Sequence, residues 1–200
     1  EDALSDEADM QLAIPDPDEP GWDELVAYLD AHQDAIARLR EAAAMPGVGF
    51  EMRRSYSGAD LSLFAQGGDA ERRAFFGEPR GERLGDVLIP HLGRFRRIGR
   101  LLGADAVAAA ERGDAEACAA DLLALMGLGV HVAEHTLLMN QMMRISFYIS
   151  AIKGISWVVQ VHPDLFSEAQ LAALSERIAE AVTFELDITG ERMLFDDYLQ

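Results

Sequence analysis

The sequence lacks the paired cysteines that form the disulfide bonds of small secreted modules. Its 200 residues include a single cysteine, Cys118, so no disulfide can form within the chain. A disulfide-stabilised module is therefore excluded, although a chain of this length buries about 70% of the surface that its unfolded form exposes and needs no staple. Cys118 lies in an apolar helical pattern, and we interpret it as a small core residue rather than a nucleophile.

The sequence also lacks a signal peptide and a stretch apolar enough to span a membrane. The longest apolar stretch, residues 145–161, is about 17 residues long and includes Lys153 and Gln160, whereas a span needs about 20 predominantly apolar residues. Because the chain begins with Glu1 rather than Met, we expect it to have been processed or trimmed, which leaves room for an anchoring segment upstream.

Basic residues are scarce: 17 Lys and Arg stand against 35 Asp and Glu, a formal net charge of −18. The first thirty residues contain no Lys or Arg and eleven acids, which are Glu1, Asp2, Asp6, Glu7, Asp9, Asp16, Asp18, Glu19, Asp23, Glu24 and Asp30. Such a surface repels phosphate groups, which makes nucleic acids and anionic membranes poor partners. Residues 1–19, with two prolines and no apolar period, are predicted to be a flexible acidic lead to one globular domain over residues 20–200.

What the sequence does contain is apolar residues at alternating steps of three and four, the spacing of one face of a helix. The clearest stripe predicts a helix over residues 22–43, ended by Pro46 and Gly47, and consists of Trp22, Leu25, Leu29, His32, Ile36, Leu39 and Ala43. Further helices are predicted over residues 90–112, 114–133, 136–161 and 167–182, and after Thr189. Asp114 and Ser167 are the predicted caps of the second and fourth of these helices. In the helix over residues 167–182, the side chains predicted to face inward are Leu171, Leu174, Ile178 and Val182. The pattern predicts an all-α, single-domain antiparallel bundle of five to six helices.

The helical pattern that starts at Asp114 must break before residue 161, although it contains no proline. One continuous helix would be about 72 Å long at 1.5 Å per residue. A domain of 200 residues has a radius of gyration of only about 16–17 Å. We predict the break at residues 133–136, where Thr136 can cap the next helix, with Gly127 and Gly129 as the alternative.

The helix predicted over residues 136–161 is apolar nearly all round, which favours a place at the centre of the bundle. Met139, Met142 and Met143, with Met126 nearby, form a soft cluster that can line a ligand cavity or a protein groove. We favour core packing for them. A small-molecule carrier with a methionine-rich interior, and hence a closed cavity beside Met142, is an alternative.

Residues 47–86 interrupt the helical pattern with frequent glycines, yet they hold four of the nine phenylalanines: Phe50, Phe64, Phe75 and Phe76. A disordered loop would not be so aromatic, so we predict an irregular segment packed over one end of the bundle. Long irregular segments in compact domains are often functional. The sequence leaves open whether this segment forms a pocket lid or only seals the core.

The sharpest motif is His131-Val132-Ala133-Glu134-His135, which matches the His-x-x-Glu-His pattern of inverted zinc proteases. On a continuous helix the two histidines share a face, with Glu134 beside them as a base. His131, Glu134 and His135 are thus candidate metal ligands of a metal-dependent hydrolase. Because the predicted helix break falls inside the motif and no further ligand stands out, we favour histidines near a helix end, with no metal, cofactor or catalytic residue.

Arginines are concentrated in one part of the chain. Eight of the seventeen basic residues lie within 29 positions: Arg72, Arg73, Arg80, Arg83, Arg94, Arg96, Arg97 and Arg100. In so acidic a chain we expect them to pair with the protein's own carboxylates; an anionic ligand or an acidic partner is the alternative.

The predicted helices also carry short motifs: Arg40-Glu41-Ala42-Ala43-Ala44 with Pro46 and Phe50; Pro90-His91-Leu92, Arg100-Leu101-Leu102 and Asp105-Ala106; Gly113-Asp114 with Ala117, Asp121-Leu122 and Ala124-Leu125; and Thr136-Leu137-Leu138 with Gln141 and Arg144-Ile145. Over about residues 22–195 the chain resembles an uncharacterised family of all-helical proteins of planctomycete-type bacterial genomes. The resemblance implies an envelope-side domain, often behind an N-terminal membrane anchor, and a break near residue 135, but no activity. The hairpin over residues 101–126 also resembles a single tetratricopeptide unit, without a second copy at that period.

The sequence alone does not define an activity. We predict a non-enzymatic binding or scaffold domain of the cell envelope, on the outer side of a bacterial membrane, with a cytoplasmic location as the alternative. The expected partner is a protein or peptide, with no nucleic acid, no membrane span in this chain and no cofactor. The metal-dependent hydrolase and the small-molecule carrier are the competing hypotheses, and the oligomeric state stays open.

Overall fold

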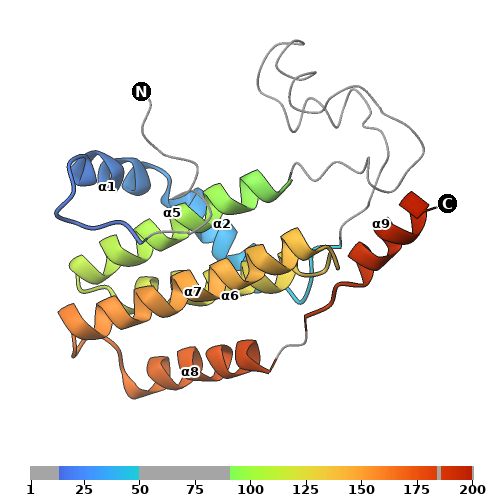
Figure 1. The fold of residues 1–200 in the computed structure, drawn as a ribbon. Helices are drawn as coiled ribbons and strands as arrows, with labels where there is room; N and C mark the ends of the chain where they lie inside the picture. Colours follow the sequence, from blue (N-terminus) through green and yellow to red (C-terminus); the bar gives the residue numbers. More distant parts are fainter. Residues whose placement is uncertain (1–13, 50–90, 184–185, 200) are drawn as a thin grey trace, which may run out of the picture.

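The structure, a computed structural model, describes residues 14–49, 91–183 and 186–199 (Figure 1). Within these ranges every regular element is an α-helix, which confirms the predicted all-α fold. The helices are α1 (Trp22–Ala31), α2 (Gln33–Ala43), α5 (His91–Glu111), α6 (Ala115–Val132), α7 (Leu138–Val161), α8 (Glu168–Val182) and α9 (Thr189–Leu199). The described part holds seven helices rather than five or six because the first predicted helix is broken in two.

The continuous helix predicted over residues 22–43 is wrong at His32, which separates α1 from α2. His32 has φ −120° and ψ 18°, outside the α-helical region. Its amide donates to the Leu29 carbonyl at 2.9 Å, its Nδ1 donates to the Tyr28 carbonyl at 2.7 Å, and its ring stacks on that of Tyr28. These local bonds hold the kink, while Leu29 and Ile36 on either side of it stay buried.

The hairpin between α5 and α6 forms as predicted. Gly113 has φ +73°, a left-handed conformation that glycine adopts without strain, and its amide donates to the Ala110 carbonyl at 2.9 Å. The Asp114 carboxylate then accepts a hydrogen bond from the Ala117 amide at 3.0 Å and caps α6. These two residues turn the chain so that α5 and α6 run antiparallel.

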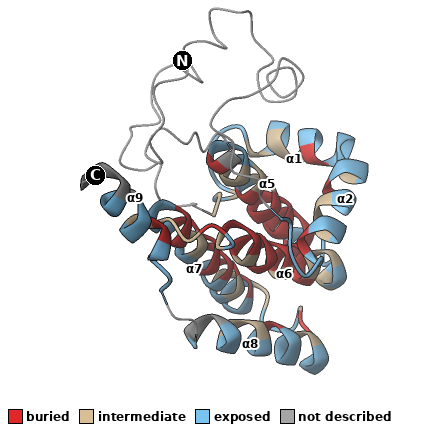
Figure 2. Ribbon diagram, turned by 90° about the vertical axis from the view of Figure 1, so that its right-hand side faces the viewer, coloured by how far each residue is buried: buried red, intermediate tan, exposed pale blue. Residues whose placement is uncertain are grey.

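The centre of the bundle is α6, so the prediction that the helix over residues 136–161 lies there is wrong. Helix α6 packs against α2, α5, α7 and α8 and is buried along most of its length (Figure 2). The prediction that no stretch is apolar enough to span a membrane is wrong by length and composition, because α6 meets both criteria; it is the one helix in the described ranges that does, and 67% of it is buried inside the bundle. Its central position accounts for its hydrophobicity. Cys118 lies here, and burial raises the pKa of its thiol to about 12, which confirms a core residue.

The break predicted at residues 133–136 is confirmed, since α6 ends and α7 begins on either side of it. The alternative at Gly127 and Gly129 is wrong because both glycines lie inside α6. Their missing side chains allow close packing instead. A Cβ on Gly127 would overlap the carbonyl group of Ala43 in α2, and one on Gly129 would lie 3.2 Å from the ring of Tyr148 in α7.

The prediction that Thr136 caps α7 is wrong. Leu137 is the residue before the first turn, and its side chain makes no capping hydrogen bond. The cap comes from α9, because the Glu191 carboxylate accepts a hydrogen bond from the Leu138 amide at 2.9 Å. The Thr136 carbonyl in turn accepts from the Gly190 amide at 3.1 Å. The start of α9 is therefore fastened to the start of α7.

The predicted entry into α8 is confirmed. Ser167 Oγ accepts from the Gln170 amide at 3.3 Å, and the Gln170 side chain accepts from the Ser167 amide at 2.9 Å, which forms a capping box. Leu174 is buried as expected. Leu171 is 41% exposed, so its predicted inward orientation is wrong.

Two predicted segments lie partly outside the described residues. Of the acidic lead over residues 1–19, the structure describes only residues 14–19, and Ile14 lies against α7, with its Cδ1 3.1 Å from where a Cβ on Gly154 would be. Of the irregular segment over residues 47–86, it describes only residues 47–49.

Candidate functional site

The His-x-x-Glu-His motif lies at the end of α6 and in the turn after it, against the residues that follow α2. His131 Nε2 lies 2.8 Å from the Met45 carbonyl oxygen. Because a carbonyl only accepts hydrogen bonds, Nε2 carries the proton, and its lone pair is not available to a metal ion. His135 is 8% exposed, and burial lowers its pKa although the neighbouring Glu134 opposes this shift, which favours the neutral ring.

The Glu134 carboxylate binds the backbone of residues 48 and 49, which follow α2. Its Oε1 accepts from the Val48 amide at 2.6 Å, and its Oε2 accepts from the Gly49 amide at 2.8 Å. A Cβ on Gly47 would lie 2.8 Å from Glu134 Oε1, so a larger residue there would require the Glu134 carboxylate to shift. Both carboxylate oxygens are thus engaged by backbone. Over residues 14–49, 91–183 and 186–199, no three His, Cys, Asp or Glu side chains come together in a group that could hold a metal ion. The geometry favours a structural role for the motif.

Replacing Glu134 by alanine is expected to release the residues after α2 without unfolding the bundle. Because two hydrogen bonds to a charged acceptor are lost, the Val48 and Gly49 amides should exchange with solvent deuterium at least ~10-fold faster. Hydrogen exchange followed by NMR measures this, with the exposed Glu176→Ala of α8 as the control. Unchanged exchange at both amides would contradict the contact.

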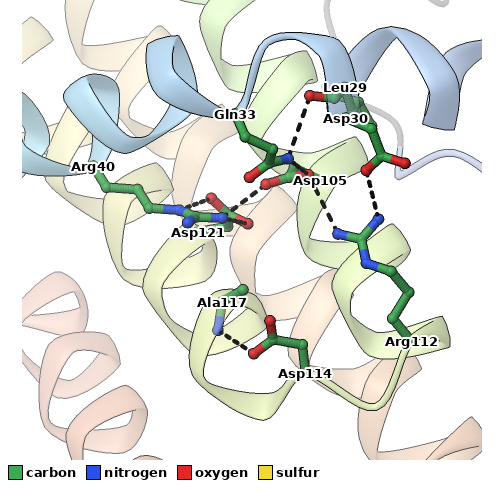
Figure 3. A network of polar contacts seen from close by, with 9 residues as sticks. All are labelled: Leu29, Asp30, Gln33, Arg40, Asp105, Arg112, Asp114, Ala117 and Asp121. Carbon is green, nitrogen blue, oxygen red and sulfur yellow. Dashed lines mark hydrogen bonds and ion pairs between the residues drawn. The ribbon is translucent and has the colours of Figure 1, made fainter.

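A second polar cluster joins α2 to the core and was not predicted (Figure 3). Arg40 of α2 donates from Nε and Nη2 to the two oxygens of Asp121 at 2.6 and 2.8 Å, and from Nη2 to Asp105 at 2.7 Å. Gln33 adds a hydrogen bond to the other oxygen of Asp105 at 2.9 Å. Both carboxylates are fully buried, Asp105 in α5 and Asp121 in α6. The cluster therefore ties three helices together.

The electrostatics of this cluster are unbalanced. Burial raises the pKa of Asp121 to about 7, the Arg40 hydrogen bond opposes this shift, and the neighbouring Asp105 adds to it. Asp121 shares the Arg40 guanidinium with Asp105, whereas Asp105 also has Arg112 Nη2 at 3.8 Å, so Asp121 is the less well compensated of the two carboxylates. Since neither carboxylate is exposed to solvent, we interpret the cluster as structural rather than catalytic.

A groove of about 400 Å³ lies between α2, α6 and α8. Its lining consists of apolar side chains together with Arg40 and Arg177. Arg177 already donates to Glu180 at 2.6 Å, as Arg40 does to its two carboxylates, so the groove offers little net positive charge to an anion. None of the methionines lines it.

The favoured prediction of core packing is confirmed for Met126 and Met143, which are buried, and wrong for Met139 and Met142, which are 53% and 46% exposed. The alternative, a closed carrier cavity beside Met142, does not fit a side chain that lies on the surface.

The largest unexplained feature is an exposed apolar row along α7. Its members are between 37% and 46% exposed and follow each other at helical steps of three, four and seven: Leu138, Met142, Ile145, Ile149, Ile152 and Val159. We call them the α7 face. They extend over about 32 Å at 1.5 Å per residue. Helix α7 is apolar all round, but α5, α6 and α8 cover only its other side, where Met143, Phe147 and Ala151 are buried. Monomeric proteins rarely leave so long an apolar row exposed.

The α7 face also differs in charge from the rest of the molecule. Helix α7 contains Arg144 and Lys153 and no Asp or Glu, whereas each of the other described helices contains at least one acid. Its formal net charge of +2 equals that of α5, in a chain with a formal net charge of −18. The row of apolar residues and the lack of carboxylates together make the α7 face the candidate site.

Comparison with known proteins adds no assignment. No family model matches the chain, and it matches no curated protein and no solved structure. The resemblance to an envelope family therefore stays a prediction. The class that can be defined is an all-α helical bundle with an exposed apolar helix face.

Proposed function

We propose that this domain is a non-enzymatic protein-binding domain, that its interface is the α7 face, and that the partner presents an amphipathic helix with acidic flanks. The exposed apolar row along α7 is the observation that carries the proposal. The predicted cell-envelope setting is independent of it and stays a prediction.

The shape of the α7 face supports a helical partner. Apolar side chains spaced at three and four residues form a straight row along one helix, and a second amphipathic helix is the element that lies along such a row. Helix α7 is 24 residues long, so the row offers several turns of contact.

The charge of the α7 face supports acidic flanks on the partner. Helix α7 contains Arg144 and Lys153 and no carboxylate, so acidic flanks on a partner meet no like charge from α7 itself. A basic partner would instead be drawn to helices with a net negative charge, such as α1 and α8.

A photoreactive benzoylphenylalanine in place of Ile149 tests the proposal in the cells that produce the protein. Irradiation should give adducts with an acidic amphipathic helix, identified by mass spectrometry, and adding Ile145→Glu should reduce their yield at least ~10-fold. The same group in place of Leu171 is the control, because this leucine is 41% exposed but lies on α8. Equal yields from both positions, or adducts without any such helix, would refute the proposal.

A further inference from the structure

We propose that the helix that lies on the α7 face is α9 of a second copy of this chain, exchanged reciprocally in a twofold dimer. This inference rests on the proposed function, since it names the partner of the same surface. It has its own support in the composition, exposure and position of α9.

Helix α9 has the properties that the α7 face requires of a partner. Met193 and Phe195 on it are 56% and 68% exposed, the latter more than any other large apolar residue of the described part. It carries Glu191, Asp196 and Asp197 against a single Arg192, so its net charge is opposite to that of α7. Each of the two helices exposes apolar side chains that a contact between them would bury.

The position of α9 prevents it from lying on the α7 face of its own chain. Its first turn is fastened to the start of α7 by the bonds of Gly190 to Thr136 and of Glu191 to Leu138. From there α9 runs away from the bundle, beyond the end at which α7 begins (Figure 1). The fastening is tight, because a Cβ on Gly190 would lie 2.8 Å from the Thr136 carbonyl oxygen.

A twofold axis near this end of the bundle would bury the exposed apolar side chains of α9 and those of the α7 face in the same contact. It places each projecting α9 beside the α7 of the other copy, with the start of both α7 helices near the axis. Helix α9 has 11 residues and is about 16 Å long, so it covers the first half of the face, around Met142, Ile145 and Ile149.

Sedimentation equilibrium of the full chain at 0.15 M salt, where the Debye length is about 8 Å, tests the inference. The chain should be a dimer, and Phe195→Asp and Ile149→Glu should each raise the dimer dissociation constant at least ~10-fold. Leu171→Glu is the matched control and should leave it unchanged. Circular dichroism and the thermal midpoint of each variant establish that the fold is intact.

Mixing the two interface variants shows whether they weaken the dimer by disrupting the contact between α9 and the α7 face or by disturbing the fold of each chain. The Phe195→Asp chain keeps an intact α7 face and the Ile149→Glu chain keeps an intact α9, so the mixture can form one complete contact where each variant alone forms none. Heterodimers in the mixture, tighter than either homodimer, are the expected result. A monomeric wild type, or a dimer that Phe195→Asp does not weaken, overturns the inference. If the wild type is monomeric but Ile149 adducts identify a different acidic helix, the proposed function stands and only this inference fails.

Discussion

Replacing Arg40 by alanine is expected to lower the free energy of unfolding at pH 8 by about 3–5 kcal/mol, because it leaves the fully buried Asp121 without a cation and the fully buried Asp105 with only Arg112, 3.8 Å away. Urea unfolding followed by circular dichroism measures the loss. Arg38→Ala is the matched control, since Arg38 is an exposed arginine on the same helix, and its replacement should change stability by less than about 0.5 kcal/mol. Equal effects of the two substitutions would contradict the assigned role of Arg40.

The loss should depend on pH in a direction set by Asp121. Its pKa is about 7 in the folded chain and about 3.8 when unfolded, so between these values the folded state binds more protons. The contribution of this carboxyl to stability is therefore fully present below about pH 4 and is lost as the pH rises through 7. Without Arg40 its pKa rises further, and the deficit of the Arg40→Ala chain should be smaller at pH 5 than at pH 8. A deficit that grows on acidification would show that Arg40 acts in another way.

Replacing Gly127 by alanine is expected to lower the free energy of unfolding by about 1–3 kcal/mol. The new Cβ would overlap the backbone carbonyl of Ala43, and backbone cannot rotate away as a side chain can. Helix α2 must then move off α6, which also strains the bonds of Arg40. A chevron or thermal unfolding experiment detects the change.

The matched control for Gly127 is Gly93, a helical glycine in α5 that is exposed and has nothing within 4 Å of a built Cβ. Gly93→Ala should be neutral or raise stability by up to about 1 kcal/mol, because alanine is the better helix former. If Gly127→Ala is as harmless as Gly93→Ala, the close crossing of α2 and α6 is not part of the folded protein.

The sequence was sufficient where the relevant signal is local. The turn at Gly113 and Asp114, the capping box at Ser167 and the break around residues 133–136 follow from short-range chemistry and from chain length, and all three are confirmed. The kink at His32 was missed because it rests on one ring stacking on Tyr28 and bonding its carbonyl, which leaves the apolar period intact.

The sequence could not predict which helix lies at the centre of the bundle, because two helices are apolar enough to occupy that place. Helices α6 and α7 are both apolar, and only the packing of α2, α5 and α8 around α6 decides that α7 keeps an exposed face. The buried cluster had a visible signal: Asp105 and Asp121 are lone acids among alanines and leucines, where an unpaired charge is costly. Its partner Arg40 lies more than sixty positions away, and only the folded chain brings the three together.

We infer that residues 14–49, 91–183 and 186–199 leave the α7 face open for a partner. Methyl NMR of the Phe195→Asp chain, labelled at isoleucine Cδ1 and titrated with a soluble paramagnetic agent, tests this most directly. The account predicts strong broadening of the Ile145, Ile149 and Ile152 methyl signals and little broadening of the buried Ile36. Signals of Ile145, Ile149 and Ile152 that are as protected as that of Ile36 would mean that the chain covers this face itself, and no partner surface would remain there.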